Sequence, residues 1–581
     1  MDIIARAKYV MENAMCANPE KTEAGYRIYF TISPFPDPKA EHMQWDDGDG
    51  TARGLDAWLY LREMTGDRLT GKEVEEGQWE YLQGRIHPQT GLVYVADLSF
   101  PHREGYYYHM WDQGRTLRHL VNRYIMGSHT EEEKKHTAMM IDKMIQSLKF
   151  LGTEKILDDN EPALYWAHDH YVDSMPIQND RDWVVCNGQL LEPVTKYAQA
   201  TGSSSLLIWA IKLANGFIAG LEINRWESTS PMFGEQGEFF GHFHCIASGL
   251  AGLAFLAGVL IQSGMRKKGN TYLDVAMRAY KWIFSEQNAN RGGSHGWFPE
   301  QISPNGISRM SEICGTADMV EFTVALASIS KLGEEYSYLD RFWDAADRFT
   351  RNYLCRMQIL HPEKLERWID PEYARDQEKV RTIYNKIRGA WGVGQAWPHD
   401  LMDFETETGS YDKKRVLVWG CCFYSGPRGL YSCWSHAVEK SDGLIDICLP
   451  IKYEDEAIRI CDRSSGGIVF TLMKSQRVTI RVPGTVDPGS ARLFSGGDEI
   501  HVLYDGKTNR IELDAKPGLE YEVKWDPLYW ESDETMGLPN NGHVQNVLSG
   551  VKIKYHLKYW GNTLVHITPD EGAFLPYLDG L

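Results

Sequence analysis

Residues 247–263 read ASGLAGLAFLAGVLIQS, an apolar run that ends at Gly264. The next segment, residues 272–283, reads YLDVAMRAYKWI and has apolar residues at spacings of three and four, which is typical of an amphipathic helix. Gly264 is a suitable C-cap for the first helix. The region therefore predicts a helical hairpin, with one helix buried and its partner covering it.

The same pattern returns along the first four hundred residues. Helices are predicted at residues 55–65, 190–201 and 320–332, each followed by a glycine, and an amphipathic helix is predicted at 338–349. Each hairpin needs neighbours to cover its apolar face, so the array is either an open superhelix or a closed toroid of paired helices. The irregular period favours the closed toroid.

After about residue 440 the pattern changes to short alternating or β-branched runs. The predicted strands are residues 467–472, 477–482, 499–504, 510–513 and 521–525. Asp505-Gly506 is a hairpin signal. We expect a mainly α protein with C-terminal β structure: a helical toroid at residues 1–437 followed by a β-sandwich at 438–581.

Composition limits the function. The chain has 581 residues, 43% of them hydrophobic and 24% charged, which is a globular composition large enough for more than one domain. Its formal charge of −19 argues against a nucleic-acid partner, because such proteins need a dense basic face. The 19 Trp and 30 Tyr suit stacking on sugar rings, although filling a wide core explains most of them.

Ten scattered cysteines do not resemble a disulfide framework. The N-terminal residues carry an early acid and no apolar core of signal-peptide length, and the run at 246–261 suits a buried helix better than a membrane span. These features predict a cytoplasmic protein with no membrane partner. A homodimer is compatible with them.

Four residues carry the strongest chemical signal: Glu312 and Cys314 in SEICG, and the adjacent Cys421 and Cys422 in WGCCF. One carboxylate and three thiols make a tetrahedral set for zinc, or a thiolate nucleophile with an activating metal. Glu312 and Cys314 can face one ion only if their segment is extended or begins a helix. Cys421 and Cys422 are predicted to lie in a loop or tight turn.

From these residues alone, two other interpretations stay open. The cysteines can be ordinary buried thiols. They can also form a structural zinc site, although such sites usually use closer Cys-x-x-Cys pairs.

The sequence resembles the β-L-arabinofuranosidases of glycoside hydrolase family 127 and its relatives. The stretches that carry the resemblance are SEICGTADM at 311–319, Cys421-Cys422, WFPE at 297–300, GQLLE at 188–192, and VTIRVP at 478–483. They follow the family's order over most of the chain, and the Glu-x-Cys and Cys-Cys pairs are the specific part.

The resemblance implies an (α/α)6 barrel followed by β-sandwich domains. It also implies a zinc ion held by Glu312, Cys314, Cys421 and Cys422, with Cys421 as the nucleophile and Glu300 as the acid/base. A metal-held thiolate can attack an anomeric carbon, so the expected reaction is a retaining double displacement on an oligosaccharide or glycoside.

The sequence departs from the family at two points. Gln189 stands where active members resemble Gly-His-Leu-Ile-Glu, so an amide replaces an imidazole that contacts the sugar, and the substrate is put in doubt. Gly241-His242-Phe243-His244-Cys245 has two histidines where the family has one at a helix start. We predict a pocket role for His244, with His242 in reserve.

Other polar clusters are weaker. Asp46 and Asp47 could accept hydrogen bonds from sugar hydroxyls, or form a solvated turn beside a helix cap. His168-Asp169-His170 is an improbable second metal site. Trp391 and Trp397 could line a cleft, but core packing is the more common use.

Three function classes remain. The first is the zinc-thiolate glycosidase acting on a β-L-arabinofuranoside or related sugar. The second is another carbohydrate enzyme on a helical toroid, such as a lyase or unsaturated uronyl hydrolase, which would not need the cysteines. The third is a non-catalytic carbohydrate-binding protein in which zinc only ties two segments together.

Overall fold

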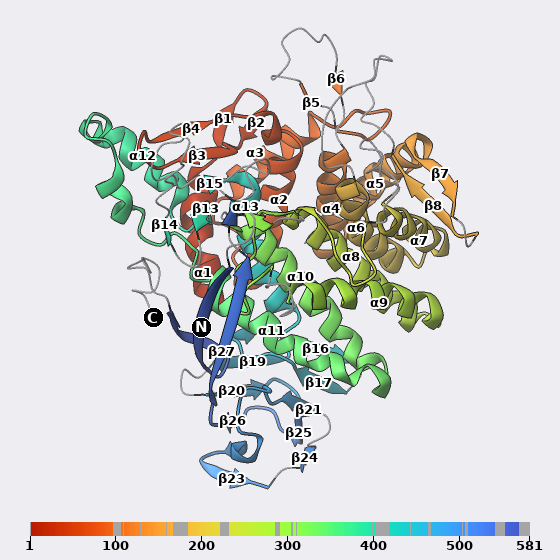
Figure 1. The fold of residues 1–581 in the computed structure, drawn as a ribbon, viewed down its shortest axis with the longest axis vertical. Helices are drawn as coiled ribbons and strands as arrows, with labels where there is room; N and C mark the ends of the chain where they lie inside the picture. Colours follow the sequence, from red (N-terminus) through yellow and green to blue (C-terminus); the bar gives the residue numbers. More distant parts are fainter. Residues whose placement is uncertain are drawn as a thin grey trace.

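The computed structural model places helices in most of the chain and strands in its last quarter (Figure 1). The residues that the structure describes are 2–93, 95–96, 106–107, 110–127, 130–157, 160–166, 184–220, 232–284, 291–303, 306–308, 311–396, 400–401, 418–441, 443–462, 466–501, 503–505, 509–537, 539–540 and 552–568.

Six helices contact one another in a closed cycle. Each packs against the next, and the last packs back on the first. In order they are α2 (Asp49–Thr65), α4 (Met110–Met126), α6 (Val184–Thr201), α8 (Phe243–Gln262), α10 (Ile313–Ile329) and α13 (Gly420–Ser435). The prediction of a mainly helical chain with C-terminal strands is confirmed.

Further helices cover this cycle from outside: α5 packs on α4, α7 on α6, α9 on α8, and α11 on α10. The outer helices are α1 (Ile3–Val10), α3 (Lys72–Gln83), α5 (Glu131–Leu151), α7 (Ser204–Ala219), α9 (Arg266–Ile283), α11 (Phe342–Phe349) and α12 (Gln377–Ile387). The predicted hairpin at 247–283 is therefore the pair α8 and α9.

Two helices of the cycle, α8 and α10, are long and apolar enough to cross a membrane by length and composition. Both are largely buried in the protein, because neighbours in the cycle contact them on two sides and an outer helix on a third. An all-round apolar surface is what such a position requires.

The predicted glycine caps are partly confirmed. Gly66 ends α2 with φ 69°, and its N–H bonds to the carbonyl of Arg62. This left-handed conformation favours glycine. Gly333 differs: it follows a short 3-10 turn, Ser330–Leu332, and has an extended backbone with φ 162°. The helix predicted at 338–349 begins as a 3-10 segment, Glu334–Arg341, and becomes α-helical only at Phe342.

The strands after α13 form two main sheets. The five-stranded sheet has the order β16 (Val438–Ser441), β17 (Leu444–Ile447), β21 (Gln476–Arg481), β25 (Arg510–Ala515), β24 (Leu503–Asp505). The six-stranded sheet has the order β18 (Tyr453–Glu454), β19 (Ile458–Asp462), β20 (Gly467–Leu472), β26 (Glu520–Lys524), β22 (Arg492–Ser495), β23 (Asp498–Ile500).

One predicted strand is wrong in this region. The run at 499–504 is two strands, β23 and β24, which belong to different sheets. Alternation alone cannot show that a chain leaves one sheet and enters another. The hairpin expected at Asp505-Gly506 agrees with the antiparallel pairing of Asp505 with Arg510, although the turn itself lies outside the described residues.

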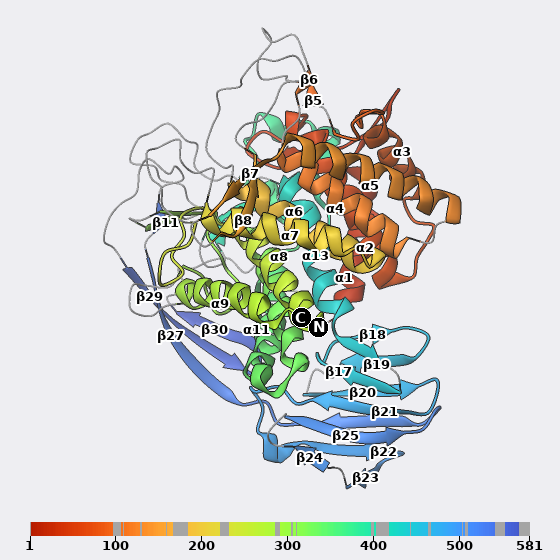
Figure 2. The same cartoon turned by 90° about the vertical axis from the view of Figure 1, so that its right-hand side faces the viewer.

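The last strands return to the helical part. β27 (Tyr529–Gly537), β29 (Lys552–Trp560) and β30 (Thr563–Thr568) form one sheet, which runs beside α9 and α11 in Figure 2. β28 (Pro539–Asn540) pairs in parallel with β11 (Gly306–Ser308). The hydroxyl of Tyr559 lies 2.7 Å from that of Ser294. The predicted domain boundary between residues 437 and 438 stays a prediction. The contacts of β28 with β11 and of Tyr559 with Ser294 link the two predicted domains.

The remaining strands are short and lie among the helices. They are β1 (Glu20–Thr22), β2 (Gly25–Arg27), β3 (Thr31–Ser33), β4 (Lys39–Glu41), β5 (Val95–Ala96), β6 (Tyr106–Tyr107), β7 (Thr153–Ile156), β8 (Pro162–Tyr165), β9 (Gly241–His242), β10 (Gln301–Ser303), β12 (Ser311–Glu312), β13 (Val393–Ala396), β14 (Asp400–Leu401) and β15 (Val418–Trp419).

Candidate active site and metal centre

Three helices of the cycle begin in the same way, each directly after a two-residue strand. β9 leads into α8, β12 into α10, and β15 into α13. The residue before each helix, His242, Glu312 or Trp419, has an extended backbone. Side chains at these junctions and in the first helical turns are therefore turned toward one end of the cycle.

This geometry confirms one prediction and corrects another. Glu312 and Cys314 lie at the junction between an extended residue and a helix, as predicted. Cys421 and Cys422 were expected in a loop, but they lie in the first turn of α13, which continues through Gly426 and Pro427. Gly426 lies inside the helix and does not form a turn. A side chain at this position would collide with the indole of Trp391, so glycine is present because the helix packs closely against that ring.

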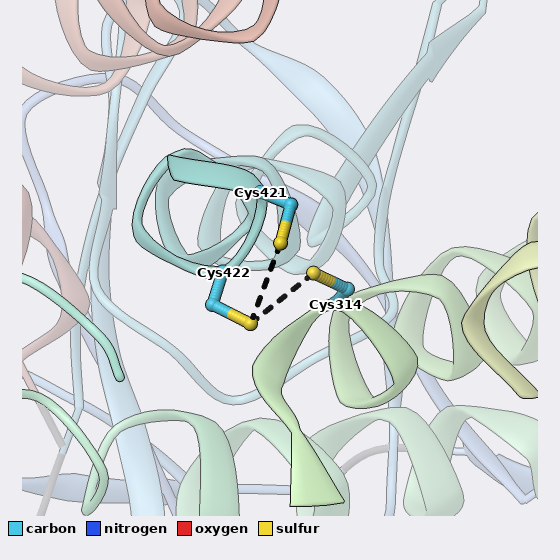
Figure 3. Close-up of side chains that lie close together, drawn as sticks. All are labelled: Cys314, Cys421 and Cys422. Atoms are coloured by element: carbon cyan, nitrogen blue, oxygen red, sulfur yellow. Dashed lines mark hydrogen bonds between the residues drawn. The ribbon is translucent and has the colours of Figure 1, made fainter. Parts of the chain in front are cut away.

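The three thiols meet between α10 and α13. The sulfur of Cys314 lies 3.4 Å from that of Cys422, and the sulfurs of Cys421 and Cys422 are 4.0 Å apart. Figure 3 shows the three side chains pointing toward one another. All three sulfurs lie within 4.8 Å of one another, too far apart for a disulfide but close enough to share one ion.

The thiols differ in exposure and in acidity. Cys421 is 8% exposed, whereas Cys314 and Cys422 are fully buried. Burial raises the pKa of Cys314, but hydrogen bonds from the other two thiols and the charge of Arg53 bring that pKa well below its usual value. The hydrogen bond with Cys314 holds the pKa of Cys421 well above its usual value, and burial does the same for Cys422. The three cysteines lie at helix N-termini, which favour negative charge on sulfur.

This donor set fits a soft or borderline divalent metal. Thiolates select zinc and similar ions over magnesium or calcium. Three buried sulfurs within reach of one ion match the residues expected to hold zinc, and they leave a position for a fourth ligand.

Glu312, the expected fourth ligand, lies against a histidine. Its Oε2 is 2.7 Å from Nε2 of His242, and His242 Nδ1 is 3.0 Å from the sulfur of Cys245. Ligand atoms of Glu312, His242 and Glu300 all lie within 4.8 Å of one another. Among the described residues, Glu312 therefore groups with His242 and Glu300 instead of forming one compact set with all three thiols.

Glu300 is placed by short strand pairs. Its carbonyl accepts from the N–H of Phe243, and the next residue, Gln301, pairs with His242 between β10 and β9. The side chain is partly exposed, unlike that of Glu312, which is buried. A carboxyl group is thus presented beside the start of α8, where an acid/base would meet solvent and substrate.

His244 is held in one tautomer. Its Nε2 lies 3.2 Å from Nη2 of Arg53 and 3.4 Å from Nη2 of Arg115, while Nδ1 contacts the carboxylate of Asp318. Guanidinium groups only donate, so Nε2 accepts and Nδ1 carries the proton. Burial lowers the pKa of His244 well below its usual value, and the two arginines lower it further. The ring is buried and neutral, and it lies between two arginines and the carboxylate of Asp318.

Gln189, predicted to contact the sugar, lies on α6 and is buried. Its Oε1 accepts from the hydroxyl of Ser248 on α8 at 3.3 Å. Its Nε2 is buried with no hydrogen-bond partner among the residues that the structure describes. The amide therefore has an unused donor, and its role in sugar binding stays a prediction.

Asp46 and Asp47 form a separate cluster before α2. Asp46 accepts from the N–H of Phe30 and pairs with His42 and Arg27, while Asp47 accepts from the hydroxyl of Tyr81. Burial raises the pKa of Asp46 to about 6, against the charge of Arg27. Both carboxylates are engaged within the protein, and no described contact joins them to the thiols. Their role as sugar ligands stays a prediction.

Trp391, Trp397 and the segment 168–170 were also considered from the sequence. Trp391 is fully buried and donates to the carbonyl of Leu354, which is the expected core role. Trp397 and the segment 168–170 lie outside the described residues.

Sequence reasoning missed the charged residues around the thiols. Arg53 pairs with Asp49 one helical turn earlier and donates to Ser425. The indole of Trp111 lies 5.5 Å from the Arg53 guanidinium and 4.8 Å from that of Arg115, and it is only partly buried. An Asp and an Arg four residues apart at the start of a helix were the available signal for Arg53.

Comparisons with known proteins bear on the fold. No protein-family model matches the chain, and no curated protein does. Among solved structures, a family 127 β-L-arabinofuranosidase from Geobacillus stearothermophilus T6 aligns with a TM-score of 0.53 at 13% identity, over 91% of this chain and 78% of that one.

A second family 127 β-arabinofuranosidase aligns with the same TM-score and identity over 97% of this chain and 81% of its own. A third structure, described as a glycoside hydrolase, has a TM-score of 0.52 at 11% identity, over 89% and 76% of the two chains. The fold is that of family 127. The resemblance seen in the sequence is thus confirmed for the fold, at low identity.

Proposed function

We propose that this protein is a zinc-dependent retaining glycoside hydrolase that uses a cysteine thiolate as its nucleophile and acts on β-L-arabinofuranosides or a related sugar. The observation that carries the proposal is the convergence of Cys314, Cys421 and Cys422 at the N-termini of α10 and α13. The fold shared with family 127 enzymes supports it.

The proposal includes a finer architecture. The closed cycle from α2 to α13 would be the inner ring of an (α/α)6 barrel, and the two large sheets after Val438 would pack as a β-sandwich. A cytoplasmic location remains part of the proposal.

Within this site the residues have separate roles. Cys314, Cys421 and Cys422 would hold the ion, and Glu312 would have to turn away from His242 to complete the ligand set. Bound zinc would keep the thiols ionised at neutral pH. Cys421 is the most exposed of the three cysteines, which supports its assignment as nucleophile.

The reaction would have two steps. Glu300 donates a proton to the leaving oxygen while the sulfur of Cys421 bonds to the anomeric carbon and the glycosidic C–O bond breaks. Glu300 then takes a proton from water, whose oxygen bonds to the same carbon as the C–S bond breaks. The two inversions retain the anomeric configuration.

A screen of aryl furanosides and pyranosides tests the proposal, with zinc content measured on each protein. Wild type should hydrolyse at least one furanoside, and Cys421→Ser should not. The control is Cys461→Ser, because Cys461 is an exposed thiol on β19. No turnover of any substrate would refute the glycosidase.

The same screen separates the other function classes. Activity that survives in Cys421→Ser would favour a lyase or uronyl hydrolase that does not need the thiols. Bound zinc without turnover of any glycoside would favour a carbohydrate-binding protein with a structural metal.

A further inference from the structure

A second set of metal-ligating atoms lies beside the thiols. His242, Glu300 and Glu312 come from three segments, the strand β9, the bend before β10, and the strand β12. One nitrogen and two carboxylate oxygens of these residues lie within 4.8 Å of one another. Strand pairing between Gln301 and His242 fixes two of these segments relative to each other.

The imidazole of His242 is oriented for binding. Cys245, one turn into α8, lies at its Nδ1, and Nε2 is directed at Glu312. When Nδ1–H donates to the sulfur, the lone pair of Nε2 points at the carboxylates. Metal-binding histidines are usually held in this way by an acceptor at the other ring nitrogen. The His242 side chain is 20% exposed, so an ion can reach it from solvent.

The two sets differ in chemistry. Three sulfurs bind a soft or borderline ion, whereas one imidazole and two carboxylates also accept harder transition ions such as Co²⁺ or Mn²⁺. We propose that His242, Glu300 and Glu312 form a second divalent-cation site next to the thiol site, and that its occupation inhibits the enzyme. The inhibition rests on the proposed function, whereas the binding does not.

The inhibition follows from the identity of Glu300. A carboxylate bound to a cation cannot carry the proton that the leaving oxygen needs. The second ion would also draw Glu312 away from the thiols. Hydrolysis should therefore rise with the first equivalent of metal and fall with the second.

Titration of the metal-free protein with Co²⁺ tests the site, followed by absorption and by equilibrium dialysis. Wild type should bind about two ions, of which only the first gives sulfur-to-cobalt charge transfer. His242→Gln should bind about one ion and keep that band. Cys422→Ser should weaken the band and still bind an ion at the second site.

A matched control and a second variant complete the experiment. His42 also lies between two carboxylates, Glu20 and Asp46, but on opposite sides of its ring, so His42→Gln should leave the stoichiometry unchanged. Glu300→Gln removes a carboxylate ligand that is partly exposed. This variant should also fail to bind the second ion.

Binding of only about one ion by wild type, or of about two by both His242→Gln and Glu300→Gln, would overturn the site. Hydrolysis that is unaffected by the second ion would overturn the inhibition. If no glycoside is hydrolysed at all, the proposed function fails while the stoichiometry still decides the site.

Discussion

Nε2 of His244 lies 3.2 Å from Nη2 of Arg53, which joins the start of α8 to the first turns of α2. Arg53 also pairs with Asp49 and contributes to the low pKa of Cys314. One cation thus contacts both a histidine of α8 and a buried carboxylate of α2, and its charge acts on the thiol cluster.

Replacing Arg53 with Gln should destabilise the protein by about 3–5 kcal/mol, because it removes the nearer cation from buried Asp49 and leaves only Arg115, 3.9 Å away. Urea unfolding measures this loss. The double variant Arg53→Met with Asp49→Leu should recover most of the stability, since it removes both charges. Equal stability of wild type and Arg53→Gln would show that the pair contributes nothing.

Loss of a thiol should remove the metal. Cys314→Ser should lower zinc affinity by more than ~100-fold, because even indirect partners of metal ligands contribute about 10–100-fold. Competition with a chromophoric chelator measures the affinity, and Cys461→Ser is the control. Unchanged affinity in Cys314→Ser would exclude the thiols as the metal site.

His295 should make stability depend on pH. Burial, with a smaller contribution from Arg356, lowers the pKa of His295 to about 3, against 6.5 without burial. The unfolded chain then takes up a proton that the folded protein does not. With respect to this group, the free energy of unfolding is therefore highest above about pH 6.5 and falls as the pH falls toward 3. At pH 5 this loss is about 2 kcal/mol.

His295→Gln should flatten this slope between about pH 6.5 and 5, as measured by urea unfolding at each pH. His566, which is on β30 and has an exposed side chain, provides the control variant His566→Gln. A wild-type slope that persists in His295→Gln would assign the effect to other groups.

Gly426→Ala should destabilise the protein by about 1–3 kcal/mol, because the new methyl group meets the indole of Trp391. Thermal unfolding measures the loss. Gly84 has φ −63°, and an added methyl group there meets only backbone atoms at 3.5 Å or more, so Gly84→Ala is a suitable control. A similar small effect of both variants would show that α13 can shift away from Trp391.

The elements that local pattern determines could be predicted from the sequence. The strand at 467–472 is observed at those residues, and the helix predicted over 247–263 lies in α8 except for its last residue, Ser263, which is the C-cap. The junction at Glu312 and Cys314 was also predictable, because only an extended residue before a helix lets both side chains face one way.

What the sequence could not show depends on residues far apart in the chain. Glu312 meets His242 across 70 residues, and the indole of Trp391 leaves no room for a side chain at Gly426. Glycine before proline is a local signal for a turn, and the sequence does not show that this glycine packs against a distant indole. The split of the run at 499–504 has the same origin, because sheet membership is decided by partners elsewhere.

The pairing of β28 with β11 has a consequence for synthesis. Pro539 and Asn540 lie beside Ile307 and Ser308, at the edge of the sheet whose inner strand β10 directly follows Glu300. A ribosome makes the helices first, and domains fold from the N-terminus as they emerge. The helical cycle can close while this sheet still lacks its outer strand, so in a nascent chain stalled before residue 539 the three thiols should already meet while β11 still has an unpaired edge.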